Sequence, residues 1–477
     1  MDEYGEYDAL GLADLVRRKQ VSPAELLDAA LSRAEAAQGE LNCFSALFPD
    51  IARQQIADGL PEGPFKGVPY ATKDLGVEIK GAPLTGGSRA FRGNVALRDS
   101  VITERYRAAG FTLFGQTTSP EYGLTTSTES ALYGKTRNPW NREHTSGGSS
   151  GGASAAVAAG VVPMAQASDG GGSIRIPAAC TGLFGMKPSR GRIPMGPGKT
   201  ENWNGLSTVH AVSRSVRDNA AMMDVTHGGE PGARYAAPPP ERSFLEEVSR
   251  PPEKLRVALW GTAPNGTRPD AEAQAGLDAT AKLLGDLGHT VEESAPELDG
   301  AALGKGMLMI VSAHSAAMAD ARGTDLGREL GPEDLEPVTL RFVELGRTVP
   351  MADLVRADHA FIDAALTYHH WMDAGNFDLV LMPTLSREPE PLGRLSLDPE
   401  DFDAYGEAVS SFAPWCPIYN QMGAPAMSVP LHWSSRGLPI GMMFGARYGQ
   451  EGLLYRLAGQ LEEAQPWWHR RPGIWVG

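Results

Sequence analysis

The sequence predicts an α/β fold with a largely buried β-sheet, and three observations lead to this class. Short apolar segments that end in turn residues alternate with amphipathic or alanine-rich segments, and strands separated by helices build sheets that helices cover. The composition, 42% hydrophobic and 21% charged, is that of a globular protein. The 56 glycines and 36 prolines are spread along the chain, which indicates many tight turns and not disorder.

The first clear helix covers residues 22–38. Ser22 suits the N-cap, Pro23 suits the first helical position, and Glu25 completes a capping box three residues after Ser22. Leucines and alanines follow at helical spacing and form one apolar stripe. We therefore expect an amphipathic helix with one buried face.

Strands and helices then alternate along the chain. Apolar segments that end in polar or turn residues predict strands, and periodic or alanine-rich segments predict helices. The expected strands are 67–74, 111–117, 161–169, 255–261 and 377–383. The expected helices are 100–110, 150–160, 270–289 and 451–464.

Residues 228–254 form the one plausible linker, because they are rich in proline and charge. The segment either separates two domains or makes a surface excursion within one. We favour the excursion, since the apolar strands on both sides suit a common sheet. The expectation is a single domain over residues 1–477, with the motif-bearing core at about 60–220.

Charge and cysteine content exclude several classes of protein. The net charge is −15 and the pI is near 5.2, which argues against a nucleic-acid surface, because such a surface needs clustered Lys and Arg. Three cysteines, Cys43, Cys180 and Cys416, suit a reducing cytoplasm better than a disulfide framework. We expect no signal peptide, because the acidic first residues do not form a basic segment followed by an apolar one, and no apolar run is long enough to span a membrane. We expect a cytoplasmic protein without membrane partners.

A glycine-serine run, "GGSSGG" at residues 147–152, precedes the alanine-rich helix. The N-terminus of a helix carries unpaired N–H groups and partial positive charge. Ser149 and Ser150 are therefore well placed to stabilise an anion. The alternative is that they only cap the helix.

The segment "DGGGSIR" at residues 169–175 is harder to explain as packing. Consecutive N–H groups in a glycine turn form an anion-binding nest, which an acyl-transfer enzyme needs for its oxyanion. Ser173 directly follows the three glycines, so its hydroxyl is a candidate nucleophile. Asp169 and Arg175 flank the loop and could brace it as an ion pair.

A serine nucleophile needs a base. None of the ten histidines lies in a suggestive motif. Lys73 ends a buried-looking strand, where burial lowers the pKa of an ammonium and lets a neutral lysine act as a base. An ion pair with Asp74 or Asp169 is the alternative role for Lys73. No His, Cys and Asp cluster has metal-ligand spacing, so we expect no metal and no cofactor.

Taken together, these motifs resemble the amidase signature family of serine hydrolases. The resemblance rests on Lys73 after "GVPYAT", on the two glycine-serine motifs in order, and on the 24 residues between Ser149 and Ser173. Further matches are "GLFGMKPSRGRIP" at 182–194, "SRSVRD" at 213–218, "DLVLMPT" at 378–384 and "GAPAMSVP" at 423–430. Together, all of these matches extend over nearly the whole chain.

The resemblance implies a Ser–cisSer–Lys triad. Ser173 would be the nucleophile, Ser149 would follow a cis peptide bond and relay the proton, and Lys73 would be the base. The N–H groups of the second motif would form the oxyanion hole, namely those of Gly170, Gly171, Gly172 and Ser173. Ser150, Asp169 and Arg175 would support the triad and the loop.

The resemblance also implies the family's fold, a large central mixed β-sheet covered by helices on both faces. The C-terminal segments look most like bacterial hydrolases of nylon oligomers and aryl amides. We therefore expect a monomeric or homodimeric amidase that forms an acyl-enzyme with small linear, aryl or synthetic amides, with carbamates (a urethanase activity) and esters as further candidates. Candidate pocket residues near the motifs are Tyr122, Leu124, Ile174, Trp203, His210, Trp415 and Cys416.

Two other functions stay open. One is the amidase subunit of a tRNA-dependent amidotransferase, which would need partner subunits. The other is an α/β-hydrolase esterase, because residues 147–151 formally fit G-x-S-x-G with Ser149 as nucleophile. That alternative leaves residues 169–175 without a role.

Overall fold

A computed structural model describes residues 3–477. The α-helices are α1 (Ala9–Arg17), α2 (Pro23–Leu41), α3 (Pro49–Ala57), α4 (Val101–Ala108), α5 (Gly151–Ala158), α6 (Arg175–Thr181), α7 (Val216–Thr226), α8 (Phe244–Val248), α9 (Ala271–Asp286), α10 (Gly300–Leu326), α11 (Pro337–Thr348), α12 (Met351–Ala374), α13 (Phe402–Phe412), α14 (Cys416–Met422) and α15 (Glu451–Ala464). The strands are β1 (Phe44–Leu47), β2 (Pro69–Lys73), β3 (Thr112–Thr117), β4 (Glu129–Ser130), β5 (Gly134–Lys135), β6 (Arg137–Asn138), β7 (Asn141–Thr145), β8 (Met164–Asp169), β9 (Phe184–Lys187), β10 (Thr208–Ser213), β11 (Arg256–Leu259), β12 (Thr290–Glu293), β13 (Leu379–Pro383), β14 (Ala426–Trp433) and β15 (Pro439–Gly445).

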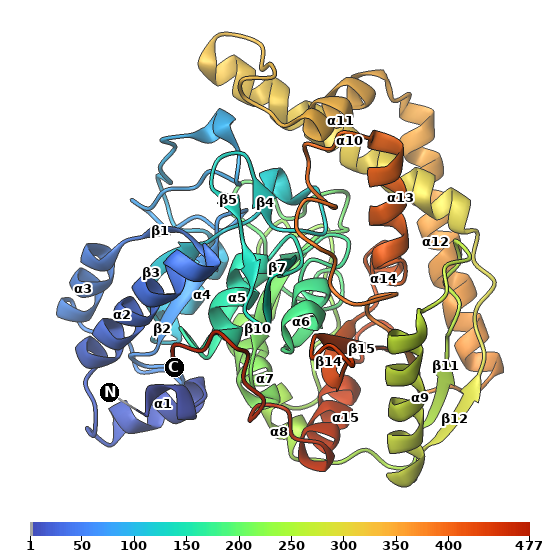
Figure 1. The fold of residues 1–477 in the computed structure, drawn as a ribbon, viewed down its shortest axis with the longest axis horizontal. Helices are drawn as coiled ribbons and strands as arrows, with labels where there is room; N and C mark the ends of the chain where they lie inside the picture. Colours follow the sequence, from blue (N-terminus) through green and yellow to red (C-terminus); the bar gives the residue numbers. More distant parts are fainter. Residues whose placement is uncertain (1–2) are drawn as a thin grey trace.

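The largest sheet is mixed and has eight strands in the order β12-β11-β13-β15-β14-β9-β10-β8. Figure 1 shows its strands β12 and β11 toward the right of the molecule and β10 near the middle. Strand β11 runs parallel to both of its neighbours, and the pairs from β13 to β8 are antiparallel. The predicted α/β class with a large mixed sheet is confirmed. Strands on both sides of residues 228–254, namely β10 and β11, belong to this sheet.

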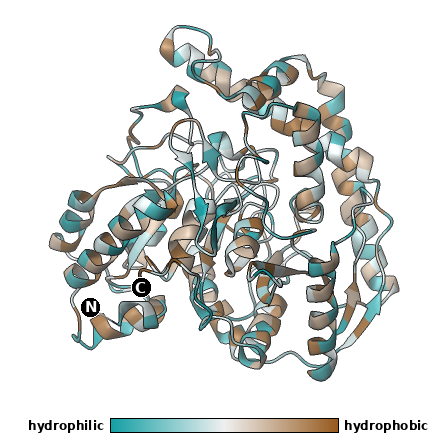
Figure 2. Cartoon of the chain, viewed as in Figure 1, coloured by the Kyte–Doolittle hydropathy of each residue, from teal (hydrophilic) through white to brown (hydrophobic). Residues whose placement is uncertain are grey.

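Helices cover both faces of the sheet because side chains alternate along each strand. In β15, Gly441 lies against Ala179 of α6, whereas the next residue, Met442, lies against Gly276 of α9. Outer helices such as α2 and α9 carry hydrophilic and hydrophobic residues side by side (Figure 2), as amphipathic helices do. The capping box of α2 is confirmed, since Ser22 and Glu25 exchange hydrogen bonds with each other's backbone.

A second sheet of three strands, in the order β1-β3-β2, lies beside the end of the large sheet. The two sheets are joined near the motifs, because Lys73 N donates to Oε1 of Gln166 on β8 at 2.7 Å. This contact brings the end of β2 next to the end of β8, where the second glycine motif begins. Within residues 3–477, no helix is both long and apolar enough to cross a membrane.

Candidate active site

Lys73 ends β2 in a fully buried position. Its Nζ lies 2.7 Å from Ser149 Oγ and 3.0 Å from Ser168 Oγ. Burial lowers the pKa of Lys73 to about 7, and the negative charge of Asp169 opposes this shift only in part. Among the described residues, no carboxylate lies within ion-pair distance of Nζ, and Asp74 instead accepts hydrogen bonds from Thr85. A buried amine next to hydroxyl groups can serve as a base.

The first glycine-serine motif turns into α5 and leaves Ser149 facing Lys73. The Gly148–Ser149 peptide bond is cis, as the family resemblance implies. Ser150 is the N-cap of α5 without a side-chain cap bond, and its hydroxyl instead exchanges hydrogen bonds with the backbone of Ser168. Ser150 therefore ties the first motif to the end of β8.

A buried ionic network supports the second motif on its side toward the protein core. Arg175 donates from Nε and Nη2 to both carboxylate oxygens of Asp169 at 3.0 Å, and both side chains are fully buried. Burial alone would raise the pKa of Asp169, but the charge and hydrogen bonds of Arg175 lower it to about 2. Asn420 on α14 bonds to both partners. The predicted pairing of Asp169 with Arg175 is thus present, with Asn420 as a third member.

The same carboxylate changes the expected oxyanion hole. The N–H of Gly172 donates to Asp169 Oδ1 at 2.7 Å, so it is already occupied. Within residues 3–477, the N–H groups of Gly170, Gly171 and Ser173 donate to no other residue. Gly172 therefore positions the loop, and the other three N–H groups are the ones that can face an oxyanion.

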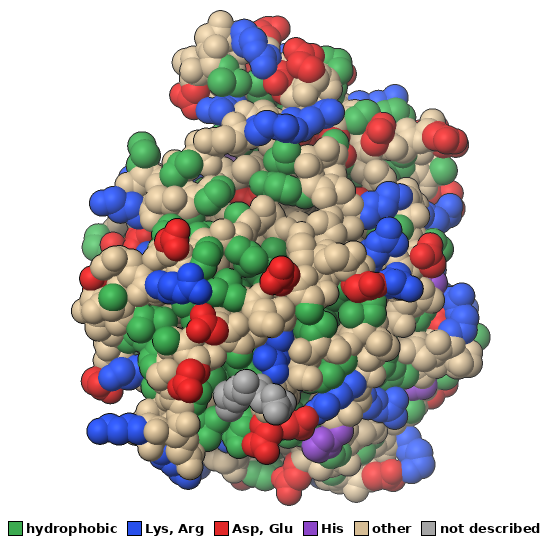
Figure 3. Space-filling view, turned by 60° about the vertical axis from the view of Figure 1, so that its left-hand side comes forward, with side chains coloured by type: hydrophobic (Ala, Val, Ile, Leu, Met, Phe, Trp, Pro, Cys, Tyr) green, Lys and Arg blue, Asp and Glu red, His purple; other side chains and the backbone are tan. Residues whose placement is uncertain are grey.

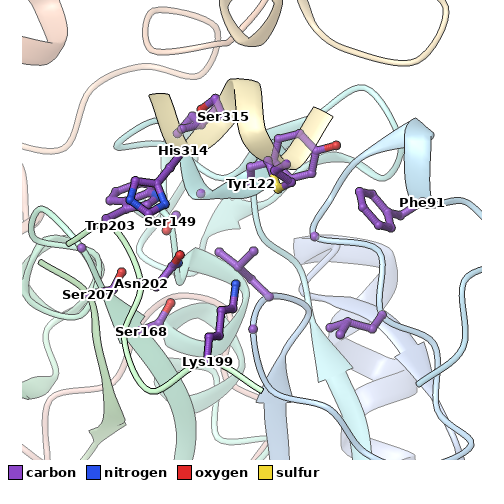
Figure 4. Close-up of a pocket in the computed structure, with 18 of the residues that line it drawn as sticks. Phe91, Tyr122, Ser149, Ser168, Lys199, Asn202, Trp203, Ser207, His314 and Ser315 are labelled. Carbon is purple, nitrogen blue, oxygen red and sulfur yellow. The ribbon is translucent and has the colours of Figure 1, made fainter. Parts of the chain in front are cut away.

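Two cavities meet at Ser173. The first, here called the Ser149 cavity, has a volume of about 560 Å³, and Ser149, Ser168 and Gly170 are among its lining residues (Figure 4). The second, here called the Met307 cavity, has a volume of about 520 Å³ and an apolar lining that includes Met307. Both contain Ser173, together with Gly123, Leu124 and Trp203. A substrate whose amide bond lies at Ser173 could thus place one part of the molecule in each cavity.

Comparison with known proteins decides the family. The family model described as Amidase matches residues 25–455. The 6-aminohexanoate-cyclic-dimer hydrolase of Pseudomonas sp. (strain NK87) is 37% identical over 484 residues, which cover 98% of this chain and 96% of that protein. A solved structure of 6-aminohexanoate cyclic dimer hydrolase complexed with substrate has a TM-score of 0.93 at 36% identity, over 99% and 100% of the two chains. A bacterial aryl acylamidase of the amidase signature family has a TM-score of 0.86 at 27% identity, over 97% and 96%.

The chain belongs to the amidase signature family.

As a member of this family it is a hydrolase of amide bonds, and the α/β-hydrolase alternative is wrong. In this amidase the hydroxyl of Ser149 faces Lys73, whereas an α/β-hydrolase nucleophile relies on a histidine. The one histidine lining the Ser149 cavity, His314, bonds instead to Asn204 at 3.0 Å.

The amidase places three of the seven predicted pocket residues on the cavities. Tyr122, Leu124 and Trp203 line the Ser149 cavity, and the latter two also line the Met307 cavity. The other four are core residues and line neither cavity, namely Ile174, His210, Trp415 and Cys416.

The prediction for His210 fails because of strand alternation. His210 is buried on β10, and its Nε2 contacts Asn219 Oδ1 at 2.9 Å and the hydroxyl of Tyr455 at 3.2 Å. Its neighbour Val209 points the other way and lines the Ser149 cavity. Burial also lowers the pKa of His210 to about 4, so this side chain is an uncharged core histidine.

Sequence reasoning missed several residues of the site. Gln166 and Ser168 occupy alternate positions of β8, so they share one face and both contact Lys73. The alternate spacing of these two polar residues can be read from the sequence once the strand is assigned. Asn420 and His314 come from helices far along the chain, and no local motif marks them.

Proposed function

We propose that this amidase hydrolyses small amides through an acyl-enzyme on Ser173, with Ser149 and Lys73 as the proton relay. The observation that carries the proposal is the 2.7 Å contact between Lys73 Nζ and Ser149 Oγ in a cavity that Ser173 also lines. A buried lysine whose pKa lies near 7 is half neutral near physiological pH, which suits a general base.

The proton path follows from this order of groups. Ser173 Oγ attacks the amide carbon and gives its proton to Ser149 Oγ, whose own proton passes to neutral Lys73. When the tetrahedral intermediate collapses, the proton returns through Ser149 to the leaving nitrogen, and the amine departs. Water then attacks the Ser173 ester by the same relay and releases the carboxylic acid.

The oxyanion would lie against the N–H groups of Gly170, Gly171 and Ser173. Donors that are fixed before the reaction stabilise the charge that develops on the carbonyl oxygen, and each is worth about 3 kcal/mol in comparable sites. The Asp169–Arg175 pair keeps this loop rigid from the buried side. Because Asp169 also accepts the Gly172 N–H, the loop cannot turn away without breaking a buried hydrogen bond.

We further propose small linear, aryl or synthetic amides as substrates. The named relatives act on a cyclic dimer of 6-aminohexanoate and on aryl acylamides, and the two cavities at Ser173 are large enough for such molecules. Carbamates and esters belong in the same assay panel, because the acyl-enzyme route also cleaves them.

Covalent trapping tests the assignment. Incubation with phenylmethylsulfonyl fluoride, followed by peptide mass spectrometry, should place one adduct on Ser173. Ser173→Ala should remove the adduct, and Ser149→Ala should slow its formation by at least about 100-fold, since proton transfer contributes about 10²–10⁴ in rate.

Ser154→Ala is the matched control, because Ser154 lies on α5 close to the motif but outside the cavity lining. It should label at the wild-type rate. An adduct on Ser149, or full labelling of Ser149→Ala, would refute the relay.

A further inference from the structure

The two cavities that meet at Ser173 differ in charge. None of the described residues lining the Met307 cavity is Asp, Glu, Lys, Arg or His. Of the same five residue types, the described lining of the Ser149 cavity contains four side chains, and these are Lys199, His314, Arg322 and Asp325. One cavity at Ser173 is therefore lined by uncharged residues, and the other carries charged side chains.

Two of those four groups neutralise each other. Arg322 Nη1 lies 3.9 Å from Asp325 Oδ2. Arg322 also donates from Nε to the carbonyl of Ala90 at 2.8 Å and covers the ring of Phe91 at 4.6 Å. Its guanidinium is thus committed to the protein.

Lys199 is the cation that remains. Within residues 3–477 its ammonium has no carboxylate within 4.0 Å and no hydrogen-bond acceptor. Glu201, two residues on, pairs with Arg234 at 2.9 Å. Figure 4 shows the Lys199 side chain projecting into the cavity.

The surroundings of Lys199 suit an anion. Asn202 and Ser207 come from the same loop, line the same cavity, and can donate hydrogen bonds. Burial lowers the pKa of His314, and the positive charge of Lys199 lowers it further. His314 is therefore neutral at pH 7 and adds no positive charge that would attract the anion. A hydrogen bond from an ammonium to a carboxylate is charge-assisted and stronger than a neutral one, and donors on the same cavity lining can add to it.

We propose that the substrate is an N-acyl amino acid whose leaving amine carries a carboxylate, which Lys199 binds in the Ser149 cavity, while an uncharged apolar acyl chain fills the Met307 cavity. This proposal rests on the proposed function. The halves are assigned by Ser149, which returns the proton to the leaving nitrogen and lines only the first cavity. Addition of one water then gives an apolar carboxylic acid and an amino acid.

Matched substrates test the proposal. N-hexanoyl derivatives of 4-aminobenzoate and 6-aminohexanoate are compared with their neutral primary carboxamides. We expect kcat/KM to favour the carboxylates by about fivefold, the upper range for a solvent-accessible ion pair. The preference should appear mainly in KM and should shrink as salt rises from about 0.05 to about 0.5 M.

Variants of Lys199 assign the effect to its charge. Lys199→Gln should lower kcat/KM for the carboxylates to the level of the matched neutral amides, and Lys199→Arg should retain most of the preference. Lys254→Gln makes the same charge change at an exposed lysine outside both cavities and should change nothing. A preference that survives in Lys199→Gln would overturn the proposal.

Two further readouts separate this proposal from the proposed function. Adipic acid monoanilide carries its carboxylate on the acyl side, and if it is preferred over hexananilide, the assignment of the two substrate parts to the two cavities is wrong.

The second readout is ligand binding to Ser173→Ala, which needs no turnover. There 4-aminobenzoate should bind more tightly than 4-aminobenzamide, and equal binding refutes the Lys199 site even if amides are hydrolysed. If neutral amides are not hydrolysed at all, the proposed function fails instead.

Discussion

At the scale of single residues, the site depends on a lysine in an unfavourable place. Burial of Lys73 lowers its pKa to about 7, and among the described residues no carboxylate lies within ion-pair distance. The unfolded chain, where the lysine pKa is about 10.4, binds more protons than the folded chain between these values. The stability contributed by this group therefore rises with pH from about 7 to about 10.4, and the penalty is full below about 7.

Measurements of activity and stability over a pH series, with Lys73→Met as the comparison, test the lowered pKa of Lys73. Wild-type kcat/KM should rise about tenfold per pH unit below 7 and level off above it, because the proposed base is neutral Lys73. Lys73→Met should lose at least about 100-fold in kcat/KM, while its melting temperature at pH 7 stays equal or rises. A flat wild-type profile from pH 6 to 10, or more than a tenth of the activity in Lys73→Met, would contradict the role of Lys73.

The buried pair of Asp169 and Arg175 gives a second prediction at this scale. Asp169→Asn leaves the Arg175 charge buried without its partner, so we expect a loss of about 3–5 kcal/mol in the free energy of unfolding. Urea denaturation measures it. Glu292→Gln breaks a solvent-exposed pair with Arg256 and should cost less than about 1 kcal/mol. Equal losses in both variants would argue against the buried network.

At the scale of elements, helix α5 matters because it is small. All of its residues are buried, and it contacts β2, β3, β8, β10 and α6. A Cβ on Gly152 would lie 2.4 Å from the backbone N of Thr118 and 2.7 Å from the carbonyl O of Cys43. Alanine and glycine side chains thus let the first motif approach both sheets closely.

Gly152→Ala should therefore destabilise the protein by about 1–3 kcal/mol, since backbone atoms cannot give way easily. The control is Gly285→Ala near the end of α9, where a Cβ would meet nothing within 4 Å. That change should be neutral or stabilising by up to about 1 kcal/mol because alanine favours helix. Thermal unfolding of both variants decides, and a neutral Gly152→Ala would show that the close approach is not required.

At the scale of the whole molecule, the positive and negative side chains of the surface shown in Figure 3 are mixed and do not form a large patch of one sign. The chain carries a net charge of −15, which repels nucleic acid in general. The Ser149 cavity departs from this balance, since Lys199 is its one cation without a described partner.

The purified chain should hydrolyse amides by itself, because Lys73, Ser149 and Ser173 all come from this one chain. We expect turnover of a neutral anilide without partner subunits, no change on addition of tRNA, and no loss after dialysis against EDTA. A requirement for partner proteins would favour the amidotransferase alternative. Activity that EDTA abolishes and zinc restores would overturn the expectation of a metal-free site.

Much of this site could be predicted from local sequence. The strand that ends in Lys73, the two glycine motifs and the capping box of α2 are short-range patterns, and their backbone conformations follow from nearby residues. The pocket could not be predicted in the same way. Trp415 and Cys416 are next to apolar segments but face the core, and His210 lies on the wrong face of its strand.

The fold class, the order of the motifs and the residue types able to carry acyl transfer follow from the linear sequence, because these depend on contacts within a few residues. Which groups meet in space depends on the packing of the whole chain. Lys73 and Ser149 are 76 positions apart, and Asn420 is 251 positions from Asp169. Such contacts depend on how two sheets and distant helices pack, and burial, which sets the pKa of Lys73, exists only after that packing.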